Sequence, residues 1–398
     1  MTIGILPLIK KVFNSEEMDK RDEKFLNYLS EHLQKPFKKI DKNSITSVEL
    51  PIIFIRSGGV EGDFKELFSK LKPPYILLTP DRRSALAAAL EISYYIRKKG
   101  FDAEIIHGEE IYMVNRIKAL DKIFSAKKQI KNSNIGIVGN SANWLIASDV
   151  DKNRIKDKLG ISFVEISEQR VIDAFKKATG KLNPYYCDLE MKWKNKKELL
   201  DALRMYEVLE NIAYEFKLNG MTVASYDFLE LLNTSDSLAL SLLNKEGIVA
   251  GSEGDLSSVL SMYIMHHITS QPVFEANPCK LIVNNNEVIL AHSTLPYNMA
   301  KNIQFLTHFE SGKSIGLKGK IKRGRGTIFK LSGDLKEYFV SGVDILDNLN
   351  EPFLSRTQVK VKLDEPINYF LTKSIGNHHI LCKKDYKKLL EYFCEYIN

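Results

Sequence analysis

Residues 247–269 read GIVAGSEGDLSSVLSMYIMHHIT, and the pattern changes twice within this segment. The apolar run up to Gly251 predicts a buried strand, and the apolar residues from Leu256 onward predict a helix. Glu253 and Asp255 therefore fall in the turn, beside a helix N-terminus whose positive dipole end favours ionised carboxylates. Such carboxylates suit a metal ligand or a base, although Asp255 is also well placed to cap the helix.

The chain before this segment repeats the same order of a short apolar run followed by an amphipathic stretch. This alternation predicts parallel strands covered by helices, and hence an α/β fold. The strands expected in a first domain, residues 1–150, are Ile3–Leu6, Ile52–Arg56, Tyr75–Thr79, Ala103–His107 and Ile135–Gly139. Those expected in a second α/β domain, residues 151–278, are Phe163–Ser167, Met221–Ser225 and Gly247–Gly251.

Beyond Pro278 the sequence changes to short alternating strands, such as EVILAHST, GTIFKLSG and TQVKVKL, separated by Gly, Asn and Asp turns. This pattern predicts an antiparallel, β-rich and barrel-like domain over residues 279–398. A helix at Lys384–Tyr396 is expected to follow its last strand.

Composition argues against several classes of function. The 398 residues suggest two to three domains of about 150 residues each. The net charge of +7 is small for this length and is not concentrated in an arginine-rich block, which gives no support to nucleic-acid binding. Apolar segments fall far short of the roughly 18 residues that span a bilayer, so no membrane partner is expected. The four cysteines form no CxxC pair, which is typical of a protein of the reducing cytoplasm.

Two histidine positions in the C-terminal part qualify as metal ligands. His292 ends the hydrophobic strand of VILAHST, where it should emerge from the core, although a lone histidine there is often a hydrogen-bonded core residue. In GNHHIL a strand sends His378 and His379 to opposite faces, so at most one of them serves the same site. With Glu253 these residues give a mixed oxygen and nitrogen set, which suits Mn²⁺, Co²⁺ or a similar divalent ion.

Other polar positions have two interpretations each. In THFESG a strand would point His308 and Glu310 to the same face, where they could hold a metal or each other. His266 and His267 lie within the apolar helix and are predicted to be packing or surface residues. The glycine turn at Ser57–Gly59 joins a strand to a helix, so its amides could cradle phosphate, or the glycines could serve only the tight turn.

Several of these strings together resemble the fucose isomerase-like proteins, a branch of the L-fucose and L-arabinose isomerase superfamily. They are SEGDLSSVLSMYI, FEANP, VILAHSTLPYNM, THFESG, SRTQVKV and GNHHIL, with IRSGGVEGDF and NSANWLIAS near the N-terminus. The resemblance implies two Rossmann-like α/β domains followed by a β-rich domain. It also implies a Mn²⁺-type metal, a homo-oligomer (trimer or hexamer) with sites near subunit contacts, and aldose–ketose isomerisation.

The resemblance also assigns roles to residues. The glutamate of the family's EGD-type motif falls on Glu253, as a metal ligand and proton-transfer group. The family's metal-binding histidines match His292 and the pair in GNHHIL, where His378 is the favoured member.

The family's second metal carboxylate should fall near FEANP, where Asn277 is the best-aligned residue. An amide can bind a metal weakly but cannot act as a base at neutral pH. Either Glu275 or Asp255 then supplies the missing acid, or the chain performs different or no isomerisation.

The first hypothesis is therefore a metal-dependent aldose–ketose isomerase acting on a small-molecule sugar through an enediol, with its site between the second and third domains. Glu310, Arg356 and Asn377 are expected to hold sugar hydroxyls, the alternative for Glu310 and Arg356 being an ion pair and a surface charge. The second hypothesis is a non-catalytic carbohydrate-binding or regulatory protein that retains the isomerase fold. A third is a phosphosugar isomerase that binds phosphate at Ser57–Gly59.

Overall fold

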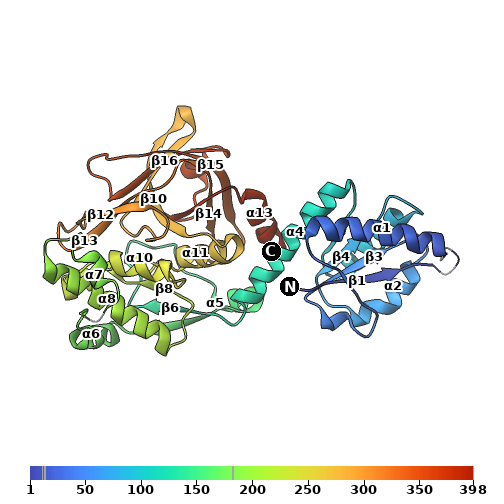
Figure 1. Cartoon of the computed structure of the whole chain (residues 1–398), viewed down its shortest axis with the longest axis horizontal. Helices are drawn as coiled ribbons and strands as arrows, with labels where there is room; N and C mark the ends of the chain where they lie inside the picture. Colours follow the sequence, from blue (N-terminus) through green and yellow to red (C-terminus); the bar gives the residue numbers. More distant parts are fainter. Residues whose placement is uncertain (11, 13–14, 182, 398) are drawn as a thin grey trace. The chain divides into compact units, whose positions relative to one another are not determined.

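The computed structural model describes residues 1–10, 12, 15–181 and 183–397. The chain divides into two compact units, Met1–Lys128 and Gln129–Asn398. Each unit contains a parallel sheet, and the second unit also contains a closed barrel (Figure 1).

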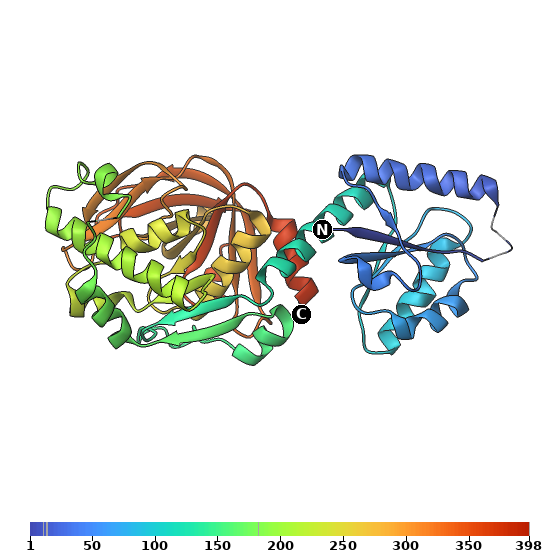
Figure 2. The same ribbon diagram turned by 60° about the horizontal axis from the view of Figure 1, so that its bottom comes forward.

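The first unit is built on a parallel sheet with the strand order β2-β1-β3-β4-β5. Its strands are β1 (Ile3–Leu8), β2 (Lys38–Lys39), β3 (Leu50–Ile55), β4 (Tyr75–Leu78) and β5 (Ala103–Ile106), and its helices are α1 (Glu16–Leu33), α2 (Glu61–Leu67), α3 (Ala85–Lys98) and α4 (Glu110–Ile130). Helix α1 covers one face, where Phe25 stacks on Phe54 of β3 at 5.8 Å between ring centroids. Helices α2 and α3 cover the other face, where Phe64 and Ile92 share a core with Ile53 (Figure 2). Burial on both faces explains why the strands are continuous apolar runs.

The second unit begins with a parallel sheet of order β7-β6-β8-β9. Its strands are β6 (Asn134–Val138), β7 (Ser162–Ile166), β8 (Gly220–Val223) and β9 (Val249–Gly251), and its helices are α5 (Lys152–Leu159), α6 (Glu168–Lys177), α7 (Tyr186–Leu189), α8 (Lys196–Glu215), α9 (Ser225–Leu232), α10 (Ser237–Lys245) and α11 (Leu256–Thr269). The strand that we expected at Ile135–Gly139 in the first sheet is β6, which instead pairs with β7 and β8. The expectation fails because apolar periodicity predicts a strand without indicating which sheet it joins.

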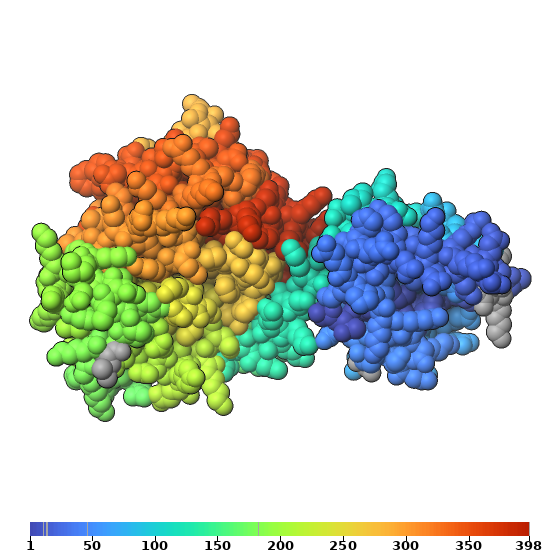
Figure 3. Space-filling model, in the orientation of Figure 1, coloured from blue at the N-terminus to red at the C-terminus, as the bar shows by residue number. Residues whose placement is uncertain are grey.

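The last part of the chain forms the closed antiparallel barrel β10-β11-β16-β15-β14-β17, as its alternating pattern predicted. Its strands are β10 (Val273–Ile282), β11 (Glu287–His292), β14 (Gly324–Leu331), β15 (Tyr338–Asn348), β16 (Thr357–Leu363) and β17 (His379–Lys383). Strands β12 (Lys301–Thr307) and β13 (Ile315–Lys320) form a separate hairpin, and helices α12 (Tyr369–Thr372) and α13 (Lys387–Ile397) complete the unit. On the face shown in Figure 3, the barrel, coloured orange to red, adjoins the green-to-yellow residues of the second sheet and its helices.

Strand pairing explains how distant segments meet at one place. Strands β8 and β9 pair in parallel, so their carboxyl ends lie at the same edge of the sheet. Two residues beyond these ends stand Ser225 and Glu253. In the barrel, β10 pairs with both β11 and β17, through Asn277 opposite Ala291 and Ala276 opposite His379. His292 and His378 therefore flank the same point of β10.

Two further expectations concern membrane-spanning helices and the cysteines. Within the described ranges, no helix is both long and apolar enough to cross a lipid bilayer. All four cysteines are free thiols, two of them exposed and two buried.

Candidate metal centre

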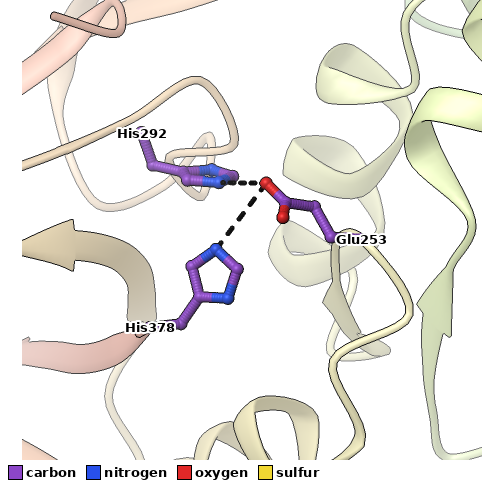
Figure 4. Close-up of side chains that lie close together, drawn as sticks. All are labelled: Glu253, His292 and His378. Atoms are coloured by element: carbon purple, nitrogen blue, oxygen red, sulfur yellow. Dashed lines mark ion pairs between the residues drawn. The ribbon is translucent and has the colours of Figure 1, made fainter. Parts of the chain in front are cut away.

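Glu253, His292 and His378 come from three separate segments and point toward one another (Figure 4). One potential ligand atom of each lies within 4.8 Å of the other two, and all three residues are buried. Oε1 of Glu253 lies 3.7 Å from Nε2 of His292 and 3.7 Å from Nε2 of His378. These separations are too long for hydrogen bonds. They are close to the roughly 3 to 3.5 Å that separates neighbouring ligands bound at about 2.1 Å to one ion.

His378 is held so that one ring nitrogen is left for a ligand. Its Nδ1 lies 2.9 Å from Oδ2 of Asp255, and since an ionised carboxylate only accepts, Nδ1 carries the hydrogen. Nε2 then presents a lone pair toward Glu253, and it is buried without a hydrogen-bond partner in the described part of the chain. A carboxylate that orients a histidine in this way is the usual support of a metal-binding imidazole. The residues present therefore fit a divalent metal ion.

The ring of His292 is also held through its Nδ1, in this case by a hydroxyl group. Its Nδ1 lies 2.8 Å from the hydroxyl oxygen of Thr294, which leaves Nε2 directed at Glu253. The two imidazole rings meet edge to face, with 5.3 Å between their centroids. Both histidines thus offer Nε2 to the same point.

Glu253 itself stands in a left-handed backbone conformation, with φ +61°. The next residue, Gly254, has φ +71°, and a Cβ there would lie 2.5 Å from the Cα of Ser141. The loop after β6 clamps this turn, because the hydroxyl of Ser141 donates to the Gly254 carbonyl and the amide of Ala142 donates to the Glu253 carbonyl. The same loop brings Trp144, whose indole N–H donates to Oε2 of Glu253 at 3.0 Å. Backbone strain held by surrounding contacts is common at functional positions.

The charges of the cluster are mutually dependent. Burial would raise the pKa of Glu253, but the imidazoles of His292 and His378 hold it well below its usual range. Burial would likewise lower the pKa of His378, but Asp255 and Glu253 raise it above its usual value. In the metal-free protein, Glu253 is therefore ionised and a proton competes for Nε2 of His378.

The two acids expected to replace the family's second carboxylate both have hydrogen-bond partners of their own. Asp255 caps α11 by accepting from the amide of Ser258 at 2.8 Å, which confirms the capping interpretation, and its other oxygen holds His378. Lys330 Nζ lies 3.9 Å from Asp255, with both side chains completely buried. Glu275 accepts through Oε2 from the amide and hydroxyl of Ser252 at 2.8 and 3.0 Å, while its Oε1 is buried without a hydrogen-bond partner in the described part of the chain.

Three other predicted site residues, Asn277, Asn377 and Arg356, are not members of the three-residue cluster. Asn277 is half-buried on β10, opposite Ala291 and therefore one position from His292, but it does not line the pocket described below. Asn377 is exposed beside His378. Arg356 donates to the carbonyl and hydroxyl of Thr307 at 2.6 and 2.9 Å, so much of its guanidinium is already bound.

The histidines outside the cluster have other partners. Strand β12 ends before His308, so this residue and Glu310 meet in a turn rather than on one strand face, with Nε2 and Oε2 3.2 Å apart. His379 turns away from the cluster, and its Nε2 lies 2.9 Å from the hydroxyl of Tyr369. His266 and His267 contact Gln271 and Gln129, respectively, as expected of packing or surface residues.

A small polar pocket of about 30 Å³ opens beside Glu253 and His292. Its walls carry many hydroxyl groups and several carboxylates. The residues that line it are Ser225, Tyr226, Asp236, Ser237, Ser252, Glu253, His292, Ser293, Thr294, His308, Glu310 and Ser355. Glu310 is therefore the expected sugar-binding residue that faces this pocket.

Sequence reasoning missed Asp236, Ser225 and Trp144. Asp236 is buried, and the hydroxyl of Ser225 donates to its Oδ2 at 2.6 Å. Burial raises the pKa of Asp236 to about 6. A signal existed for Ser225, which is the last residue of a predicted strand, but Asp236 in TSDSLAL reads as an ordinary residue before a helix.

Comparison with known proteins gives one distant similarity and no family assignment. No protein-family model matches the sequence. The chain is 20% identical over 313 residues to a sulfoquinovose isomerase of Alkalicoccus urumqiensis, an alignment that covers 72% of this chain and 67% of that protein. This similarity supports a relationship to sugar isomerases at most, and it does not single out the fucose isomerase-like branch.

Proposed function

We propose that this protein is a metal-dependent sugar isomerase that interconverts an aldose and a ketose. The observation that carries the proposal is the convergence of Glu253, His292 and His378, with a buried Nε2 on His378 that has no partner in the described chain. The distant similarity to a sulfoquinovose isomerase supports the same reaction class. The hydroxyl-rich lining of the adjacent pocket suits a ligand that carries many hydroxyl groups.

The three ligands would hold Mn²⁺ or a similar divalent ion, because one carboxylate and two imidazoles form a mixed oxygen and nitrogen set. A bound ion of this kind stabilises negative charge that develops on neighbouring sugar oxygens. Asp255 orients His378 toward the ion, and Trp144 holds Glu253.

Sugar contacts are proposed on the open side of the cluster. Glu310 lines the pocket and would accept hydrogen bonds from sugar hydroxyls. Arg356 and Asn377 would contribute further hydrogen bonds to the sugar, and Asn277 would be a weak additional metal ligand. We further propose that the protein is a cytoplasmic homo-oligomer, a trimer or hexamer. In this assembly, segments of a neighbouring subunit would complete the small pocket.

Metal binding tests the first half of the proposal. Chelator-treated protein titrated with Mn²⁺ by calorimetry should bind one ion per chain, and Glu253→Gln should weaken binding by more than about 100-fold. His267→Asn removes a histidine on α11 outside the cluster and should leave the affinity unchanged. Equal affinities for the wild-type protein and Glu253→Gln would refute this metal site.

Proton exchange tests the second half. Aldoses and ketoses, with sulfoquinovose among them, are incubated with the Mn²⁺-loaded protein in deuterated water, and NMR follows the exchange of the sugar C–H proton next to the carbonyl. Exchange that is lost in Glu253→Gln supports an isomerase. Sugars that bind to the loaded protein without exchange would instead identify a carbohydrate-binding protein that retains the fold.

A further inference from the structure

Asp236 places a carboxyl group in the pocket, and this group neither caps a helix nor belongs to the metal cluster. It stands at the N-cap position of α10, yet its side chain makes no capping hydrogen bond. It is 4% exposed and lines the same small pocket as Glu253 and His292. Its charge interacts with both of these residues. A buried carboxyl of this kind is unfavourable for folding, which points to a role in the pocket.

A hydrogen-bond chain ties Asp236 to the metal cluster. The backbone amide of Glu253 donates to the hydroxyl of Ser225 at 3.1 Å, and that hydroxyl donates to Oδ2 of Asp236 at 2.6 Å. The position of the carboxyl is therefore fixed from the same turn that presents the metal ligand. Asp236 thus combines a defined orientation with access to the pocket.

The other carboxylates near the cluster each contact another group, including Glu310 of the same pocket, whose Oε2 lies 3.2 Å from Nε2 of His308. One oxygen of Glu253 faces both imidazoles and the other accepts from Trp144. Asp255 caps α11 and holds His378, and Glu275 is bound to Ser252 behind the turn. Isomerisation nevertheless requires a group that takes a proton from carbon and returns it.

We infer that Asp236 is the proton-transfer group of the proposed isomerase, in place of the acid that Asn277 lacks. This inference rests on the function proposed above. In the aldose-to-ketose direction, the C2–H bond breaks, its proton passes to the Asp236 carboxylate and the electron pair remains on the sugar as an enediolate. The protonated Asp236 carboxyl exchanges its proton with water and then returns a proton to C1, which forms the new C1–H bond, while the hydroxyl proton of O2 passes to O1. Both electrons stay on the sugar, so no oxidant or reductant is consumed.

The experiment compares Asp236→Asn with the wild-type protein, each loaded with Mn²⁺. Asparagine has the same shape and can still accept from Ser225, but it cannot accept a proton from carbon. We expect the Mn²⁺ affinity and the affinity for an unreactive sugar alcohol to stay within about threefold, while C–H exchange into deuterated water falls by about 100-fold or more. Asp173→Asn, which alters an aspartate of α6 whose side chain is 50% exposed, should match the wild-type protein in all three measurements.

A second variant gives a positive test. Asp236→Ala opens space in the pocket, and added formate should restore part of the lost exchange there but not in Glu253→Gln. Exchange within about fivefold of wild type in Asp236→Asn, or absence of any formate effect in Asp236→Ala, would overturn the inference and leave the isomerase proposal intact. A wild-type protein that exchanges no sugar proton would overturn both together.

Discussion

Nδ1 of His378 lies 2.9 Å from Oδ2 of Asp255, and neither side chain has any exposed surface. The contact fixes which imidazole nitrogen carries hydrogen and which faces Glu253. Because such a supporting carboxylate raises the basicity of the ligand and holds the ring, its loss typically weakens metal binding by about 10- to 100-fold.

Asp255→Asn should therefore weaken Mn²⁺ binding by about 10- to 100-fold, as measured by calorimetry, without removing any metal ligand. The same substitution also weakens the helix cap of α11. A control variant must therefore show what a weakened helix cap alone does to Mn²⁺ binding. Asp151→Asn is this control, because Asp151 caps α5 by accepting from the amide of Arg154 at 2.9 Å and is exposed. Equal Mn²⁺ affinity in Asp255→Asn and the wild-type protein would show that the Asp255 contact does not support the metal site.

The left-handed backbone at Glu253 leads to a prediction about stability. Alanine and glycine at this position both remove the carboxylate, so they differ mainly in the cost of φ +61°. A Cβ in this conformation costs roughly 1 to 2 kcal/mol, part of which the greater freedom of unfolded glycine offsets. Glu253→Gly should thus be more stable than Glu253→Ala by about 0.5 to 1 kcal/mol in urea unfolding of the metal-free proteins. An alanine variant of equal or greater stability would contradict the strain.

The buried carboxyl group of Asp236 should make the stability of the protein depend on pH. Its pKa is about 6 in the folded protein, against an ordinary value of 3.8, because burial disfavours the ion. Between these values the folded protein binds more protons than the unfolded chain, so ionisation of Asp236 lowers stability as the pH rises through 6. The full cost, about 3 kcal/mol, is present above that pH.

Asp236→Asn removes this titration and should therefore stabilise the protein relative to wild type at pH 7.5 by up to ~3 kcal/mol more than it does at pH 4. Unfolding of the metal-free proteins in urea, measured at both pH values, checks the difference. Groups remote from Asp236 titrate alike in both proteins, so their contributions cancel. A difference that does not grow with pH would mean that Asp236 ionises as freely in the folded protein as in the unfolded chain.

Local sequence patterns predicted the elements around the site better than they predicted how those elements meet. The strand and helix that flank Glu253, and the strand that ends at His292, follow from apolar periodicity, which is set by neighbours in the chain. Which strands share a sheet depends on contacts between distant residues, and so β6 was expected in the wrong sheet.

The candidate site shows the same limit. Glu253, His292 and His378 were grouped from an inventory of ligand types and from a resemblance, because no spacing in the sequence brings residues this far apart together. Asp236 was missed because a residue before a helix usually caps it, and only packing of the loop against Ser225 turns its carboxyl into the pocket. A side chain that departs from a local rule in this way is visible only in three dimensions.

The last prediction concerns the buried lysine Lys330, which lies near Asp255. Its side chain is completely buried, and its Nζ has no hydrogen-bond partner in the described ranges, although it lies 3.9 Å from Asp255 Oδ1. Burial lowers the pKa of Lys330, while the charges of Asp255 and Glu275 oppose this change. The pKa of Asp255 is in turn kept well below its usual range, against the effect of burial, largely by Lys330.

Lys330→Met should therefore remove the lysine charge beside two buried carboxylates, Asp255 and Glu275. Breaking a buried charge pair from one side typically costs about 3 to 5 kcal/mol, so a loss of that size is expected in urea unfolding. The Mn²⁺ affinity should fall as well, because a protonated Asp255 holds His378 less firmly. Lys336→Met removes a lysine whose side chain is 65% exposed and should change neither quantity by a measurable amount. If Lys330→Met unfolds and binds Mn²⁺ like the wild-type protein, Lys330 does not compensate the charge of Asp255.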